Sequence, residues 1–122
     1  MSVIKNLPVK FRTVTVTAGS PLNINGTTAS AKTDELLAEN CSALMIRNTH
    51  ASTPLMMKFY AWGTTPAGAL PAATSLRIAP STTLTLVLGT MGDRPGAQNP
   101  WFDCTAGTVK FMTAQILTNY MT

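Results

Sequence analysis

Charged side chains are scarce in this sequence. Of its 122 residues, 11% are Asp, Glu, Lys or Arg, whereas about 25% is typical of soluble domains. Only five residues are acids, and the first of them is Asp34. The nine lysines and arginines give a net charge of +4 but form no basic cluster of the kind that binds nucleic acid. We therefore expect no nucleic-acid partner, and the low charge suits a surface that other protein covers in part.

The residue types of catalytic and metal sites are equally scarce. His50 is the only histidine, and its Thr and Ser neighbours belong to a turn and not to a catalytic triad. A structural zinc site needs about four Cys or His ligands, and the chain has three such residues, His50, Cys41 and Cys104. Neither a calcium loop nor a glycine-rich phosphate loop is present. The sequence therefore predicts a protein that is not an enzyme, and it indicates neither a metal nor a cofactor.

Cysteines and long apolar runs are also rare. Two cysteines are too few for the disulfide scaffold of a small secreted domain. We expect Cys41 and Cys104 to be buried thiols, with one bridge between them as the alternative. Residues 1–12 carry no apolar segment of a signal peptide, and no run of about 18 apolar residues is present to cross a membrane. These absences predict a chain made in a cytosol, with no membrane partner.

What the sequence does have is alternation of apolar and polar residues, which is the period of a half-buried β-strand. It is clearest over residues 11–18 and 42–62. About eight such short runs, separated by turn signals, predict an all-β fold in which two antiparallel sheets form a sandwich. Eight strands favour a jelly roll. An immunoglobulin-like topology is the alternative, because Cys41, Trp62 and Cys104 superficially match its Cys–Trp–Cys pattern.

The chain reads as one β-sandwich domain, residues 11–122, that follows an N-terminal arm over residues 1–10. Pro8 blocks a helix in the arm. One short helical turn is expected near 34–39, across an end of the sandwich. In the last strand, roughly 108–118, the apolar residues change from odd to even positions. We expect a bulge there, or a crossing from one sheet to the other.

The two strands within 42–62 each have two faces of different character. One face is apolar throughout, and we assign it to the core: Leu44, Ile46, Leu55, Met57 and Phe59. The other face is too apolar for free solvent, and we expect it to meet another chain or the helical turn. Its members are Met45, Arg47, Met56, Lys58, Tyr60 and Trp62.

Aromatic and basic residues are the candidate binding groups. An exposed aromatic and basic strip is typical of surfaces that bind glycans or single-stranded nucleic acid, and Trp and Tyr are also common anchors of subunit contacts. The basic residues near the N-terminus have no acid close to them in the sequence. The candidate partner-binding residues are therefore Lys5, Lys10, Arg12, Tyr60, Trp62 and Trp101.

Five stretches together carry a family resemblance: the arm 1–10, the Thr-rich strand 12–18, the run 44–48, the strand that ends on Trp62-Gly63, and the segment 76–89. With them the chain resembles the small β-sandwich structural proteins of tailed bacteriophages, especially capsid decoration (cement) proteins. The resemblance implies a non-enzymatic virion protein, assembled in the host cytoplasm, that binds the outside of an icosahedral shell and bridges neighbouring capsid subunits.

The partners that the resemblance implies are the major capsid protein and further copies of the chain, in a dimer or trimer. We expect the arm and the loops 63–75 and 90–100 to reach these neighbours. A tail or fibre component of the same viruses has the same features. A carbohydrate-binding module, with a glycan as its partner, and a single-strand nucleic-acid binder are the other hypotheses.

Overall fold

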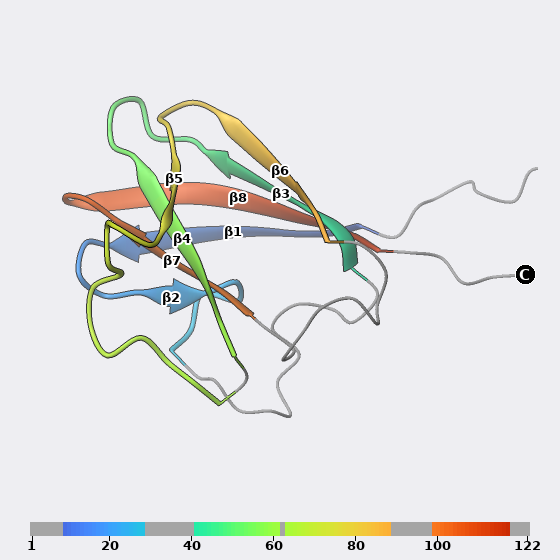
Figure 1. Cartoon of the computed structure of the whole chain (residues 1–122). Coiled ribbons are helices and arrows are strands. Elements are labelled where there is room, and N and C mark those ends of the chain that lie inside the picture. Colours follow the sequence, from blue (N-terminus) through green and yellow to red (C-terminus); the bar gives the residue numbers. More distant parts are fainter. Residues whose placement is uncertain (1–8, 29–40, 62, 89–98, 118–122) are drawn as a thin grey trace, which may run out of the picture.

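The structure, a computed structural model, describes residues 9–28, 41–61, 63–88 and 99–117. Within these ranges eight β-strands form two four-stranded antiparallel sheets, packed face to face, and no helix is present (Figure 1). The predicted all-β sandwich is confirmed. The helical turn expected near 34–39 falls outside the described residues.

Sheet A contains, in spatial order, β1 (Val9–Thr17), β8 (Thr108–Leu117), β3 (Cys41–Asn48) and β6 (Thr83–Val87). Sheet B contains, in spatial order, β2 (Leu22–Asn23), β7 (Asn99–Cys104), β4 (Leu55–Tyr60) and β5 (Leu76–Ile78). The segment expected as an arm over 1–10 therefore ends inside β1, while residues 1–8 lie outside the described part of the chain.

The strand order is that of a jelly roll. The pairs β1–β8, β2–β7, β3–β6 and β4–β5 are those of one long hairpin, and successive pairs alternate between the two sheets. In an immunoglobulin-like sandwich the first two strands lie in one sheet, whereas β1 and β2 lie in different sheets here. The jelly-roll expectation is therefore the correct one of the two topologies.

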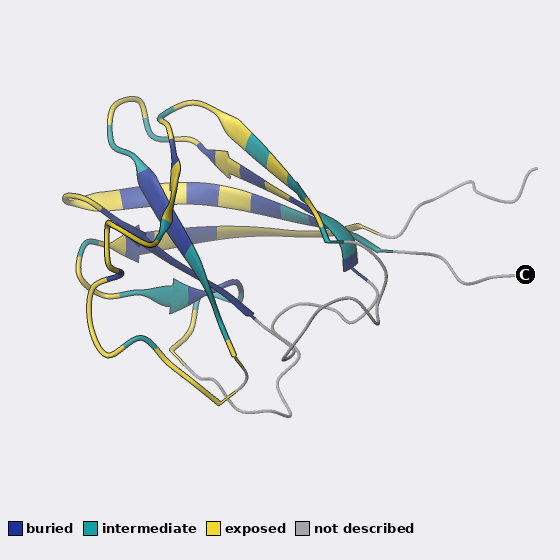
Figure 2. Ribbon diagram, in the orientation of Figure 1, coloured by how far each residue is buried: buried dark blue, intermediate teal, exposed yellow. Residues whose placement is uncertain are grey.

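The core lies between the sheets, and the alternation of the sequence builds it. In β1, Val14 and Val16 point inward and are buried, while the threonines that alternate with them are exposed (Figure 2). Phe102 of β7 and Phe111 of β8 join the two sheets, with ring centroids 4.5 Å apart. Cys104 and Cys41 are both buried and are not bonded to each other. Burial of these side chains supplies the main driving force for the fold.

The strands within 42–62 lie in different sheets, because the connector between them crosses the end of the sandwich. Asn48 holds this connector: its amide donates to the carbonyls of Thr53 (2.9 Å) and Ile78 (3.1 Å). Its side-chain oxygen accepts from the N–H of His50 at 3.0 Å. His50 in turn accepts from two backbone N–H groups through Nδ1. The expected loop position of His50 is therefore confirmed, and its hydrogen bonds serve the connector.

The core assignment for these strands is confirmed, but the assignment of one shared second face is wrong. Leu44, Ile46, Leu55 and Met57 are fully buried, and Phe59 packs against them. The remaining residues divide between opposite sides of the molecule, because β3 and β4 turn their outer sides in opposite directions. Met45 and Arg47 lie on the outer face of sheet A, and Met56, Lys58 and Tyr60 lie on that of sheet B. Trp62 lies outside the described residues.

The expected bulge or sheet crossing in the last strand is also wrong. β8 pairs with β1 without interruption from Thr108 to Ile116 and stays in sheet A. The change of apolar parity has another cause. In the second half of β8 the inward positions are polar, Thr113 and Gln115, and both are buried. Ala114 and Ile116 lie on the outside of the sheet, while Leu117 at the end of the strand packs against the core.

Candidate interaction surface

The outer face of sheet A, called face A below, carries most of the exposed apolar side chains of the described residues. Six large hydrophobic side chains are exposed, and five of them lie on face A: Val9, Phe11, Met45, Val87 and Met112. Phe11 is 74% exposed and Val87 is 83% exposed. Single exposed hydrophobic residues are normal on protein surfaces, so the informative property is that these five are neighbours.

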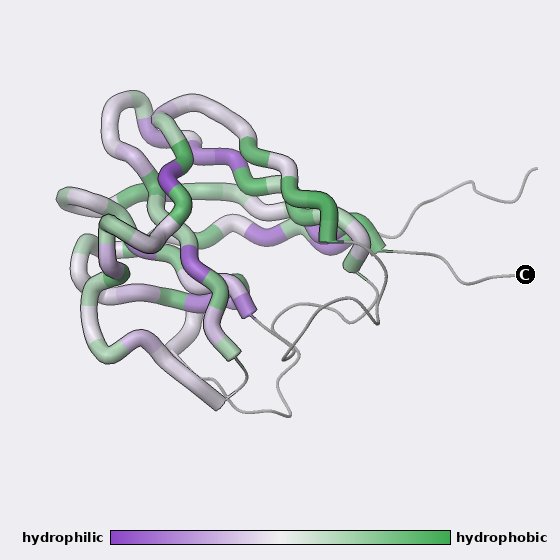
Figure 3. The backbone as a smooth tube through the Cα atoms, viewed as in Figure 1, coloured by the Kyte–Doolittle hydropathy of each residue, from purple (hydrophilic) through white to green (hydrophobic). Residues whose placement is uncertain are grey.

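The register of the four strands places the residues of face A in three cross-strand rows. The first row is Val9, Ile116, Ala43 and Val87. The second row is Phe11, Ala114, Met45 and Thr85. The third row is Thr13, Met112, Arg47 and Thr83. Apolar character thus decreases row by row from the first to the third. Figure 3 shows that the chain is also hydrophobic where β6 and β8 end, beside the first row.

A reversal of polarity produces this face. The N-terminal half of β1 pairs with the C-terminal half of β8, and the inward positions of this pairing are polar: Lys10 opposite Gln115, and Arg12 opposite Thr113. Neighbouring positions, which point outward, are Val9, Phe11, Ala114 and Ile116. The usual hydrophobic-in and polar-out pattern of a sandwich sheet is reversed at this corner.

Face A is hollowed between its strands. A depression of about 190 Å³ is lined by Phe11, Met45, Met112, Ala114, Arg47 and Thr83, and by part of Thr113. The Arg47 guanidinium lies at its edge and donates to the Thr83 hydroxyl at 3.1 Å. Arg47 and Lys110 are the charged residues of face A, and no carboxylate of the described residues pairs with either. The depression is therefore apolar, with a cation on one side.

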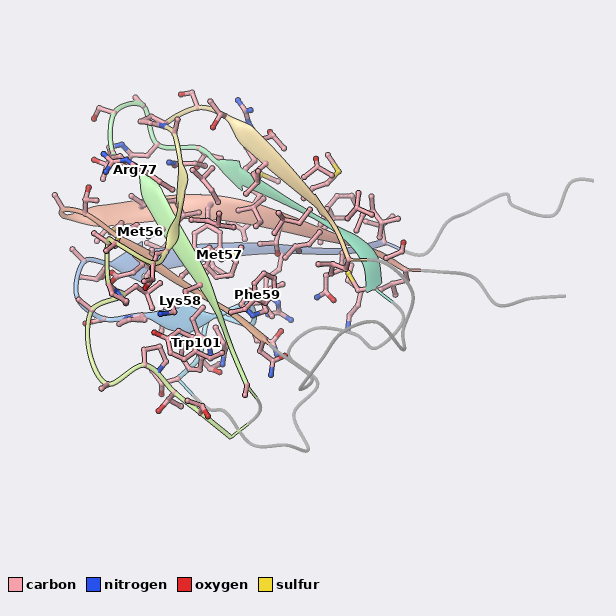
Figure 4. The ribbon with its side chains drawn as sticks, in the orientation of Figure 1. Met56, Met57, Lys58, Phe59, Arg77 and Trp101 are labelled. Atoms are coloured by element: carbon pink, nitrogen blue, oxygen red, sulfur yellow. The ribbon has the colours of Figure 1, made fainter. Side chains whose placement is uncertain are left out.

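The outer face of sheet B is built differently, because the chain itself covers it. Met56 and Trp101 point away from sheet A (Figure 4) and pack with Leu70, which comes from the loop after β4. Trp101 is only 2% exposed and Leu70 only 4%. Lys58 also holds this loop, donating to the Thr74 hydroxyl at 2.8 Å. The loop 63–75, which was expected to reach neighbours, thus packs part of its apolar surface against sheet B of its own chain.

The Asp103 carboxylate fixes this cover in place. Asp103 is fully buried, and it accepts hydrogen bonds from the N–H groups of Gly19 (3.0 Å), Leu70 (2.9 Å) and Cys104 (2.8 Å). It thereby joins the turn after β1, the covering loop and β7. Burial and the negative charge of Asp103 both raise the pKa of the neighbouring Cys104 thiol. Backbone hydrogen bonds to the thiol lower its pKa in part.

The structure does not bring the predicted partner-binding residues together. Lys10 and Arg12 are exposed on β1 but occupy inward positions at the edge of sheet A, not face A. Tyr60 is half-buried beside the sheet B cluster, with the Lys58 Nζ 5.6 Å from its ring centroid. Trp101 is buried in that cluster. Lys5 and Trp62 lie outside the described residues.

The residues of face A were missed as a group, although one sequence signal pointed to them. The even-numbered apolar residues of 108–118 are Met112, Ala114 and Ile116, and a strand that keeps one orientation must place them opposite Val109 and Phe111. Treating every apolar residue as a core residue suggested a bulge instead. Phe11 lies in the threonine-rich strand β1 and gave no separate signal.

Among the described residues no group of three or more His, Cys, Asp or Glu side chains lies close enough to hold a metal ion. Over the same ranges, no helix has the length and apolar character to cross a membrane. The comparisons with known proteins give no match, whether to a family model, to a curated protein or to a solved structure. The candidate site is face A, because its large apolar side chains are exposed.

Proposed function

We propose that this chain is a non-enzymatic structural protein of a virion, a capsid decoration protein that binds shell subunits through face A. The observation that carries the proposal is the contrast between the two outer faces. The apolar residues on sheet B are covered by the chain's own loop, whereas the described residues leave Phe11, Val87 and Met112 uncovered. A contiguous exposed apolar patch on a soluble domain is typical of a protein-binding site.

The size of the patch favours binding to a repeating lattice. With strands about 4.8 Å apart and outward residues about 6.8 Å apart along a strand, three rows on four strands project roughly 400 Å². A standard stable interface buries about 800 Å² on each partner. Face A alone therefore gives a weak contact, and many weak contacts on one shell gain strength through avidity.

The jelly-roll fold is also compatible with a role in a virion. Jelly rolls are common in viral capsid proteins, but they also occur in lectins and cupins, so the fold does not select a function. The partners we propose are the major capsid protein and further copies of the chain. A tail or fibre component of a virus uses such a face equally well, but it would not bind the shells used in the test below.

A glycan-binding module has less support. Sugar platforms stack an exposed aromatic ring on the ligand, but Trp101 is buried under the loop that contains Leu70. Tyr60 is half-buried, and Lys58 lies over its ring. A shallow space of about 240 Å³ borders Trp101, but its other lining residues are Ser20, Pro21, Thr28 and residues 65–68. None of those residues offers a second aromatic surface.

The proposal is tested with shells purified from virions made without this chain. We expect the wild-type chain to bind these shells, and Phe11→Ser combined with Met112→Ser to weaken binding at least tenfold. Leu76→Ser is the matched control, because among the described residues Leu76 is the one large exposed hydrophobic outside face A (46% exposed). This variant should bind within twofold of wild type. No binding of the wild type, or equal binding of the face A variant, overturns the proposal.

A further inference from the structure

The depression on face A has the composition of an interface centre. Aromatic residues, methionine and arginine are enriched where protein interfaces are buried most deeply, and arginine is common among the residues that dominate binding. Phe11, Met45, Met112 and Arg47 are the large side chains that line the depression. An engineered apolar cavity of about 150 Å³ binds benzene, so a depression of about 190 Å³ has room for one aromatic or branched side chain.

The charge at the edge of the depression selects the kind of partner. Arg47 has one described hydrogen bond, to Thr83, and a guanidinium enclosed by a partner needs a carboxylate to offset its desolvation. Face A supplies none. Asp103 is the one acid among the described residues, and it is buried in the cover of sheet B. The remaining acids, Asp34, Glu35, Glu39 and Asp93, lie outside the described residues.

This charge distribution also bears on pairing between copies. In a two-fold dimer the same patch faces itself, so stacking two copies of face A encloses two Arg47 side chains and no carboxylate from either face. Desolvated like charges of this kind disfavour an interface. A partner protein with a carboxylate next to its apolar contact avoids the penalty, because a bidentate pair with Arg47 then forms.

We infer that the depression on face A takes an apolar side chain of a different protein, which also brings an Asp or Glu carboxylate to Arg47. The inference rests on the proposed function, since it names the chemistry of the partner at the same face. Arg47 then sets the orientation of the partner, while Phe11, Met45 and Met112 supply the apolar contact. A second copy of the chain, or residues 1–8 of the same chain, are the other candidate occupants.

The chemistry of the depression is tested first without any shell. The probes are 3-phenylpropionate and 3-phenylpropylamine, which share an aromatic ring and differ in charge, and the signals are the methyl groups of Met45 and Met112 in NMR titrations. We expect saturable shifts at millimolar 3-phenylpropionate, at least fivefold weaker binding of the amine, and a reversed preference in Arg47→Glu. Absence of shifts, equal binding of both probes, or an unchanged preference in Arg47→Glu overturns the inference.

Binding to shells made without the chain then separates the inference from the proposed function. Arg47→Glu should bind at least tenfold more weakly than wild type, with Arg47→Lys intermediate. Arg77→Glu is the matched control, because Arg77 is exposed on β5 of sheet B and the substitution changes the net charge equally. Equal binding of Arg47→Glu overturns the inference and leaves the proposed function standing. If the wild type does not bind, the proposed function fails and the titration alone decides the inference.

The other occupants give distinct results in the free chain. Sedimentation over a concentration series, followed together with the same methyl signals, detects a dimer that shields Met45 and Met112. Removal of residues 1–8 tests whether that segment fills the depression, since the methyl signals then change without any probe. Either result overturns the inference, whereas unchanged methyl signals in both experiments support it.

Discussion

The outer faces of the two sheets both carry large apolar side chains, but only those of sheet B are covered by a loop of the described residues. Sheet B places Met56 and Trp101 on its outer side, and Leu70 of the following loop covers them. Sheet A places Phe11, Met45 and Met112 on its outer side, and no loop of the described residues packs over them. Both faces therefore carry large apolar side chains, but only one is completed within the described part of the chain.

The difference teaches which apolar surface is structural and which is available for binding. The cover of sheet B requires a buried carboxylate, Asp103, that holds three backbone N–H groups. No comparable anchor lies on face A, where the polar partners are Arg47 and the threonines beside it. An apolar face with its own anchored cover stabilises the monomer, whereas a bare one lowers the free energy of a complex.

The largest expected effect comes from breaking the cover of sheet B at its anchor. Asp103→Ala leaves the buried N–H groups of Leu70 and Cys104, and the part-buried N–H of Gly19, without their acceptor. At about 1–3 kcal/mol for each of the two buried groups, we expect the free energy of unfolding to fall by about 2–6 kcal/mol. Urea denaturation measures this fall, and amide hydrogen exchange at Gly19 and Leu70 should become faster. Asp103→Asn keeps one oxygen and should be intermediate. A fall below about 1 kcal/mol in the alanine variant would contradict the role of Asp103.

A matched pair of apolar truncations compares the two faces directly. Leu70→Ala removes a buried side chain, so we expect a loss of about 2 kcal/mol or more in the isolated chain. Val87→Ala removes a side chain that is 83% exposed, and the loss should stay within about 0.5 kcal/mol. Thermal or urea unfolding of both variants gives the comparison. Equal losses would show that Val87 is covered within the monomer, and the proposal that face A is a docking surface would then fail.

The sequence was sufficient for the fold because each strand signal is local. Alternation of valine and threonine over 11–18, and of apolar residues over 42–62, requires only that one side of each strand be buried. The eight-strand count then favoured the jelly roll over the immunoglobulin-like alternative. The assignment of β3 and β4 to different sheets was not local information. It depends on Asn48, whose buried hydrogen bonds hold the connector across the end of the sandwich.

The candidate site could not be predicted in the same way, because its signal contradicts the rule that locates the core. Met112, Ala114 and Ile116 look like core residues, and Thr113 and Gln115 look like surface residues, but the structure reverses them. For Trp101 the error was the opposite one. A tryptophan after a long loop suggested an exposed binding residue, but the side chain is buried. Its burial depends on Leu70, a contact between segments far apart in the sequence.

A smaller effect should come from the polar interior behind face A. Thr113 is 2% exposed, and its Oγ1 has no hydrogen-bond partner among the residues that the structure describes. Thr113→Val keeps the shape of the side chain and removes an unsatisfied hydroxyl, so we expect the free energy of unfolding to rise by about 1 kcal/mol. Thr15→Val, at an exposed position of β1, is the control and should leave it unchanged. Destabilisation by Thr113→Val would mean that the hydroxyl is satisfied in solution.

The smallest effect is a pH dependence that reports on the covered face. Burial, and then the charge of Asp103, raises the pKa of the Cys104 thiol above its unfolded value. The unfolded state therefore loses its proton first as the pH rises, so the stability of the folded state is complete below the ordinary thiol pKa and declines above it. By pH 9.5 we expect this decline to reach less than about 1 kcal/mol. Urea denaturation from pH 7 to 9.5 should show that the free energy of unfolding declines less steeply in Cys104→Ala than in wild type. In Asp103→Asn the decline should be intermediate, because this substitution removes only the contribution of the Asp103 charge to the raised pKa of the thiol. Identical slopes in wild type and Cys104→Ala would contradict the assignment of this decline to the thiol behind the cover of sheet B.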